Sequence, residues 1–94
     1  MKSNRQKIIL EYPAIFEPAI EGGYNVSFPA FHGCVTFGKT FEQAQEKAEE
    51  VLGLWLEELA SAKERIPVSN QRLIIADIRV SMPAKTKIYE THNG

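Results

Sequence analysis

The chain has 94 residues, a formal net charge of −1 and one cysteine, and its composition is 44% hydrophobic and 24% charged. This length predicts a single domain with a modest core, which association with a second copy would help to cover. The near-zero net charge excludes a strongly basic nucleic-acid-binding domain, and one cysteine excludes an intramolecular disulfide, which is typical of a reducing compartment.

The first predicted element is a strand at residues 7–17, KIILEYPAIFE, where apolar side chains recur at every second position. The face that we expect to be buried carries Ile8, Leu10, Tyr12, Ala14 and Phe16. Pro13 cannot donate to a strand ladder, which predicts a bulge or a neighbour that pairs with only part of this strand. Because Glu11 and Pro13 also interrupt the apolar run, we expect no signal peptide, no membrane span and a cytoplasmic protein.

Two shorter strands are predicted next, at residues 24–28 and 34–37. Gly22-Gly23 supplies the backbone freedom for a turn before the first of them, and Pro29 ends it. Within that strand, Tyr24, Val26 and Phe28 share one face, while Asn25 and Ser27 share the other. Together with the first strand, these elements predict an antiparallel meander.

The periodicity then changes, and residues 40–60 predict one long helix. Its apolar positions recur at steps of three and four residues: Phe41, Ala44, Ala48, Val51, Leu52, Trp55, Leu56 and Leu59. Thr40 and Gln43 have the spacing of a capping box. Six glutamates against Lys47 alone make this helix the acidic segment of a chain that is otherwise mildly basic.

A last strand is predicted at residues 73–80, LIIADIRV, before Pro83 and a polar tail. The expected fold is therefore α+β with the order βββαβ: a four-stranded mixed sheet with one long helix packed on one face. The helix acts as a crossover, so the fourth strand should run parallel to an internal first strand. We expect a domain at residues 1–82 and a short tail at 83–94. Ile9, Ile15 and Ile75 on the uncovered face predict a homodimer or higher oligomer.

Two groups of side chains were considered for chemistry. His32 and Cys34 lie two residues apart, but Gly33 and a preceding proline favour a turn residue and a small buried thiol over a nucleophile with its base. Glu11 and Asp77 are the acids that a metal-dependent nuclease would use, yet both point away from the face that the helix covers. We therefore expect no catalytic residue, no metal and no cofactor, with a metal-dependent nuclease or another small hydrolase on a ribonuclease H-like scaffold as the alternative.

The ordered motifs of residues 12–59 resemble those of the HicB-like antitoxins. They comprise Tyr-Pro-Ala-x-Phe, Gly-Gly-Tyr before Ser-Phe-Pro, Gly-Cys before a Gly-x-Thr helix start, and Trp-Leu-Glu near the helix end. The residues that carry the resemblance, and that we expect to serve as scaffold, are Tyr12, Pro13, Phe16, Gly23, Tyr24, Phe28, Pro29, Gly33, Cys34, Thr40 and Trp55. His32 stands where the family often has proline.

The resemblance implies a partial ribonuclease H-like fold without nuclease activity. It also implies a partner, a small HicA-type toxin that cleaves mRNA, whose catalytic histidine or RNA surface the antitoxin blocks. A solitary HicB-like protein of another role is a further alternative. Only eleven residues follow Pro83, too few for the complete DNA-binding module of many relatives. A toxin that binds RNA phosphates must be basic, so we expect it to meet the acidic helix at Glu42, Glu46, Glu49, Glu50 and Glu57.

Overall fold

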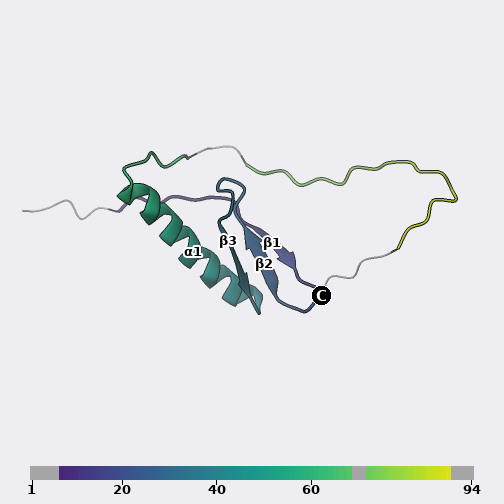
Figure 1. Cartoon of the computed structure of the whole chain (residues 1–94), viewed down its shortest axis with the longest axis horizontal. Helices are drawn as coiled ribbons and strands as arrows, with labels where there is room; N and C mark the ends of the chain where they lie inside the picture. The colour runs from purple at the N-terminus through teal and green to yellow at the C-terminus, as the bar shows by residue number, and fades with distance from the viewer. Residues whose placement is uncertain (1–6, 69–71, 90–94) are drawn as a thin grey trace, which may run out of the picture.

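The computed structural model describes residues 7–68 and 72–89, and it contains a three-stranded sheet covered by one long helix (Figure 1). The elements are β1 (Ile15–Pro18), β2 (Tyr24–Ser27), β3 (Val35–Gly38) and α1 (Phe41–Ser61). The strands lie side by side in chain order, and both pairs are antiparallel. The α+β class, the antiparallel meander and the long helix are thus confirmed.

The strand register decides which side chains face the helix. Phe16 lies opposite Val26, which in turn lies opposite Thr36. Val26 is buried in the core and Phe16 packs against it, so this row faces α1. Because successive residues of a strand point to opposite faces, the neighbouring rows point away from the helix: Glu17, Asn25 and Phe37 in one, and Ile15, Ser27 and Val35 in the other.

The first strand is shorter than the sequence predicts, because pairing begins only at Ile15. β2 ends at Ser27, opposite Ile15, so no strand of the described sheet lies opposite residues 7–14. Pro13 within that stretch has no N–H to donate. The side chain of Ile8 is 86% exposed, so the prediction that it faces the helix is wrong.

Residues 72–89 form a segment without helix or strand, here named the C-terminal arm, which extends beyond the sheet and then bends back after a turn in which the Thr86 N–H donates to the Pro83 carbonyl at 3.0 Å (Figure 1). None of its residues pairs with a described strand. The predicted fourth strand at residues 73–80 is therefore not shown, and β1 lies at an edge of the sheet instead of inside it. An alternating pattern indicates which face of a segment tends to be buried, but it does not specify the distant edge that would receive that segment.

Helix α1 begins at a cap that the sequence predicts. The Gln43 N–H donates a hydrogen bond to Thr40 Oγ1 at 3.0 Å. The Gln43 side chain reaches one residue further back than a standard capping box, since its Oε1 accepts from the Lys39 N–H at 2.6 Å. These bonds satisfy backbone groups at the junction of β3 and α1, and they fix the direction in which the helix leaves the sheet.

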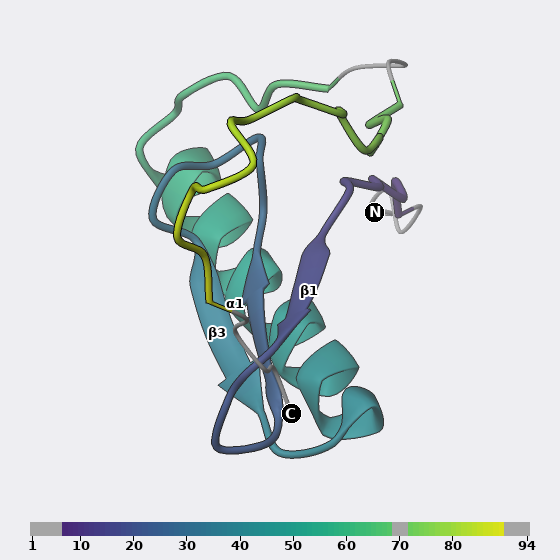
Figure 2. The same ribbon diagram turned by 90° about the vertical axis from the view of Figure 1, so that its right-hand side faces the viewer.

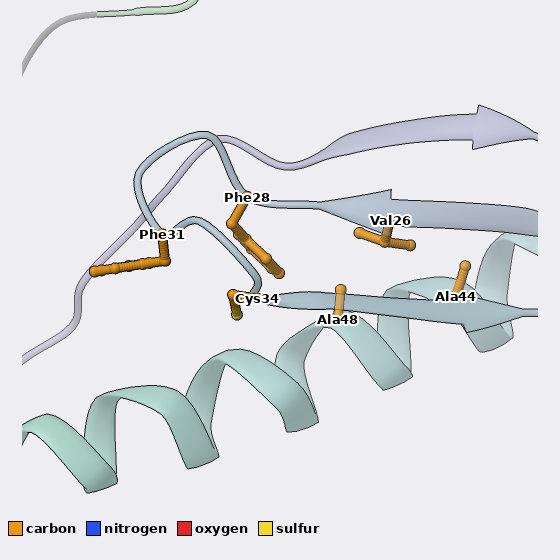
Figure 3. Packing of buried hydrophobic residues seen from close by; sticks show 6 residues of the cluster. All are labelled: Val26, Phe28, Phe31, Cys34, Ala44 and Ala48. Carbon is orange, nitrogen blue, oxygen red and sulfur yellow. The ribbon is translucent and has the colours of Figure 1, made fainter.

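The core lies between α1 and the helix-facing side of the sheet. Its buried members are Val26, Phe28, Phe31, Cys34, Ala44 and Ala48 (Figure 3). The small side chains of Ala44 and Ala48 let the first half of α1 lie close to the strands. Towards the end of the helix, Leu52 and Trp55 are half-buried and pack against the edge of the same cluster.

The closest approach of strand and helix is at Gly38. A Cβ atom on this residue would overlap the backbone nitrogen and Cα of Ala44, and it would lie 2.8 Å from the carbonyl carbon of Gln43. Only glycine fits this position, because the atoms that a side chain would meet belong to the backbone. Gly38 is the glycine of the Gly-x-Thr motif, although the residues predicted to serve as scaffold do not include it.

Candidate functional site

The loop between β2 and β3, residues 28–34, is held by two consecutive turns. The Phe31 N–H donates to the Phe28 carbonyl at 3.0 Å, and the Cys34 N–H donates to the Phe31 carbonyl at 3.1 Å. Gly33 takes a positive φ of 92° within it. The Phe31 ring lies between Tyr12 and Trp55, with centroid distances of 5.0 Å and 6.0 Å. This loop is thus anchored by a row of three aromatic rings.

His32 and Cys34 are separated by burial in this loop. Cys34 has no exposed surface and belongs to the core, whereas His32 is exposed to solvent. Burial raises the pKa of the Cys34 thiol, so the reactive thiolate is less populated than in a free cysteine. The pair has neither the accessibility nor the electropositive setting of a nucleophile with its base.

The thiol of Cys34 should therefore react very slowly with a disulfide reagent in the native protein. We expect full labelling only when urea unfolds the chain, and a His32→Ala variant should react at the same slow rate. A native thiol that reacts fast, and slows in His32→Ala, would contradict this interpretation.

The raised pKa of the Cys34 thiol also makes the stability of the protein depend on pH. The stability that comes from the neutral buried thiol is complete below the unfolded-state pKa of about 8.5 and falls as pH rises above it.

The acids considered for a metal site are both exposed. Glu11 lies before β1, and Asp77 lies on the C-terminal arm. Among residues 7–68 and 72–89, no three His, Cys, Asp or Glu side chains are grouped so that they would hold a metal ion. The positions of Glu11 and Asp77 therefore do not favour a metal-dependent nuclease.

The outer side of α1 is strongly acidic. All the glutamates expected at the toxin interface are exposed: Glu42, Glu46, Glu49, Glu50 and Glu57. Glu58 is exposed as well, Lys47 is the only basic residue of the helix, and the last turn contains no basic residue. Carboxylates near a helix C-terminus are unfavourable with the helix dipole. A basic partner would relieve this charge accumulation.

The uncovered face of the sheet carries two apolar side chains that the sequence analysis did not assign. Val35 and Phe37 are 58% and 42% exposed, on the face opposite α1. With Asn25 and Ser27 they line a shallow hollow of about 540 Å³. One sequence signal could have predicted this. Cysteine is among the most often buried residue types, and Val35 and Phe37 alternate with Cys34 and Thr36, so burial of Cys34 puts Val35 and Phe37 on the opposite face.

A larger groove of about 720 Å³, here named the groove beside β1, runs along residues 10–14, which lead into β1, and no residue of β1 itself lines it. Apolar side chains from the segment before β1, from the end of β2 and from α1 line it: Leu10, Tyr12, Ala14, Phe28, Ala48 and Leu52. Glu11 and Glu49 add negative charge, and Arg72 and Leu73 lie at the start of the arm. The Tyr12 hydroxyl donates to the Pro67 carbonyl at 2.6 Å, which ties the segment before β1 to the linker after α1.

No helix in the described part of the chain is both long and apolar enough to cross a membrane. α1 is long enough, but its glutamates exclude it from such a role. The surfaces that remain for function are thus the acidic helix, the uncovered sheet face and the groove beside β1. All three are suited to contact with another protein and none has the composition of an enclosed catalytic pocket.

Comparison with known proteins assigns the chain to a family. Residues 12–83 match the HicB-like antitoxin of bacterial toxin–antitoxin systems. A UPF0150 protein of Synechocystis, ssr1765, is 32% identical over 74 residues, which cover 79% of this chain and 91% of that protein. Antitoxin HicB 1 of Photorhabdus laumondii is 41% identical over 59 residues, which cover 63% of this chain and 38% of that protein. The chain therefore belongs to the HicB-like antitoxin family of bacterial toxin–antitoxin systems.

Proposed function

We propose that the protein is an antitoxin that neutralises a HicA-type, mRNA-cleaving toxin by direct protein–protein binding and not by catalysis. The observation that carries this proposal is the family match over residues 12–83. One of the relatives bears the name Antitoxin HicB 1. The exposed surfaces of the chain support a binding role, because they offer charge and apolar area without a grouped set of metal-ligating side chains in the described residues.

The proposed toxin interface is the acidic outer side of α1. A ribonuclease must attract RNA phosphates, so its own surface is basic. Glu42, Glu46 and Glu49 follow one another at steps of four and three residues, and neighbours at this spacing lie on one side of a helix. Their combined field would steer a basic toxin to the helix, and exposed charges of this kind act mainly on the rate of association.

The proposal is tested by mixing the purified protein with a HicA-type toxin from the same genome. RNA cleavage should stop at a stoichiometric ratio of antitoxin to toxin, because inhibition by binding saturates when every toxin molecule is occupied. Inhibition that requires a large excess, or that is absent, would overturn the proposal. RNA cleavage by the toxin-free protein in the presence of Mg²⁺ would instead support the nuclease alternative.

Replacing Glu42, Glu46 and Glu49 together by glutamine should slow the association with the toxin at low salt by roughly tenfold or more. The reason is loss of steering, since each exposed carboxylate contributes little to the affinity by itself. The difference from the wild type should shrink as salt is added and the Debye length falls to about 8 Å at 0.15 M. Stopped-flow or surface-binding kinetics at several salt concentrations measure this.

The matched control removes the same charge elsewhere. Glu17, Glu21 and Glu64 are exposed and lie outside α1, so their triple replacement by glutamine should slow association much less. If both triple variants associate equally slowly, only the net charge matters. If neither differs from the wild type, the toxin binds elsewhere, and the uncovered face at Val35 and Phe37 becomes the next candidate.

We further propose that the active form is a homodimer. Each copy would then have all four strands of the partial ribonuclease H-like fold. One helix covers only one face of the described sheet, and β1 has a free edge. A strand at residues 73–80, added parallel to β1, would complete the four-stranded sheet. The domain would then extend to residue 82 and leave 83–94 as a tail.

A further inference from the structure

The protein exposes far more surface than a folded chain of its size should. Its accessible surface is 8872 Å², whereas a compact monomer of 10.6 kDa has about 5,500 Å². The chain in this form has a large surface that another molecule can cover.

Much of this surface is on the C-terminal arm. Ile74, Ile78 and Val80 are 87%, 82% and 73% exposed, and Ile75 on the opposite side is 79% exposed. Figure 1 shows most of the arm apart from the body formed by the sheet and α1, and in Figure 2, turned by 90°, its later part passes in front of that body. Alternating β-branched residues are typical of β-strands, and an exposed segment of this composition is suited to pair with the free edge of a sheet.

The groove beside β1 has the features that such a strand needs. β1 pairs with β2 on one side only, so its other edge offers unpaired backbone groups in the described structure. The segment that leads into this edge carries Tyr12 and Ala14, which with Leu52 of α1 form an apolar wall that would receive alternate side chains. The charges also match, because Glu11 and Glu49 line the groove, whereas the arm carries Arg72, Arg79, Lys85 and Lys87 against Asp77 alone.

We propose that the arm of one copy adds as a strand to the free edge of β1 in a second copy, and that the exchange is reciprocal. Ile74, Ile78 and Val80 would then enter the groove of the partner, while Ile75 and Asp77 lie on its uncovered face. The arrangement deepens the proposed homodimer, since it names the contact that joins the two copies. It does not require the toxin, although Glu49 lines this groove and also belongs to the proposed toxin interface.

Two observations favour a second copy over the same chain as the occupant. Arg72 and Leu73 line the groove of their own chain, but no later residue of the arm does, and Ile74 is 87% exposed. The arm is also apolar on both sides, with Leu73 and Ile75 opposite Ile74 and Ile78. A groove covers only one side of such a strand, so the side that carries Ile75 stays available for contact between the two bodies of a dimer.

Cysteine pairs on separate chains test the exchange. Chains carrying Glu17→Cys and chains carrying Asp77→Cys, with different affinity tags, are unfolded together in urea, refolded and oxidised. Both positions face the uncovered side of the sheet in the exchanged form, and a disulfide requires Cα atoms within about 7 Å. A shift of two residues in register would bring Ile75 or Arg79 opposite Glu17 on the same face, so Ile75→Cys and Arg79→Cys are tested in the same way.

The expected result is a mixed disulfide between differently tagged chains for at least one of positions 75, 77 and 79. The matched control, Ile78→Cys with Glu17→Cys, should not form it, since residue 78 faces the groove on the opposite side of the strand. Light scattering of the wild type should give about twice 10.6 kDa. The buried Cys34 remains in every variant and should form no cross-link.

Three outcomes would overturn the proposal. A Glu17→Cys/Asp77→Cys double variant that cross-links only within one chain would show that the arm docks in its own groove. A dimer that forms none of the three mixed disulfides would keep the homodimer but assign it to another surface. Equal cross-linking at positions 77 and 78 would show that the arm has no fixed register. Toxin inhibition by the wild type is measured separately in each case, so a failure of the strand exchange is distinguished from a failure of the proposed antitoxin function.

Discussion

Replacing Phe31 by alanine should destabilise the protein by about 3–5 kcal/mol, the range for removal of a buried phenylalanine. Phe31 is 6% exposed and its ring contacts both Tyr12 and Trp55. Each aromatic pair contributes about 0.5–1.5 kcal/mol beyond the buried area. The expected stability of a 94-residue domain is only about 5–14 kcal/mol, so this one change removes a large part of it.

Urea unfolding monitored by far-ultraviolet circular dichroism measures the effect without relying on Trp55, whose fluorescence the substitution itself would alter. The midpoint should fall while the slope stays constant, because the area exposed on unfolding is nearly unchanged. The matched control is Phe37→Ala, which removes the same atoms from a ring that is 42% exposed. If the two variants lose equal stability, Phe31 does not anchor the loop in the way that its contacts indicate.

Replacing Gly38 by alanine should cost about 1–3 kcal/mol, the range for inserting atoms into a packed interior. The added Cβ would overlap backbone atoms of Ala44 in the first turn of α1. A flexible side chain could move aside, but this turn is held by the hydrogen bonds at Thr40 and Gln43. We expect the start of the helix to shift away from β3, and the midpoint of urea unfolding to fall accordingly.

Gly53 provides a control with the opposite expected sign. It lies inside α1, and a Cβ atom there would meet nothing within 4 Å. Gly53→Ala should therefore stabilise the protein by up to about 1 kcal/mol, since alanine is the better helix former. Destabilisation by both substitutions would show that the close approach at Gly38 is not what distinguishes them.

The parts of the fold that could be predicted depend on interactions between residues near in sequence. The stripe from Ala44 to Leu59 and the Thr40 cap are local signals, and α1 appears with nearly the expected bounds. The turn at Gly22-Gly23 is local too, and both glycines take positive φ values of 100° and 83°. For the same reason the order of motifs through residues 12–59 was sufficient to indicate the family.

What could not be predicted depends on residues that are distant in sequence. The alternation of residues 7–17 and 73–80 shows two faces in each segment, but it contains nothing about the length or the position of a partner edge. Pairing at β1 therefore begins eight residues later than expected, and residues 73–80 join no described strand. Likewise, the need for glycine at position 38 arises only once the start of α1 crosses β3.

The candidate site was only partly visible in the sequence. The exposed glutamates of α1 follow from the helical period, since they lie off the apolar stripe. The groove beside β1 combines Leu10, Phe28 and Leu52, which come from three segments, and no sequence pattern brings them together. To predict that Val35 and Phe37 are exposed, one must know which face of a four-residue strand is buried, and only the tendency of Cys34 to be buried indicates it.

The chain order of the sheet has a consequence for synthesis on the ribosome. Strands β1, β2 and β3 and helix α1 each contact the next element in sequence, so the body closes only short loops and should form quickly. The ribosome makes the arm after every element of the body has been made. Nascent chains on neighbouring ribosomes of one message would then present complete grooves while their arms are still emerging. Pairing of copies during translation would reduce the time for which the apolar arm is exposed to aggregation.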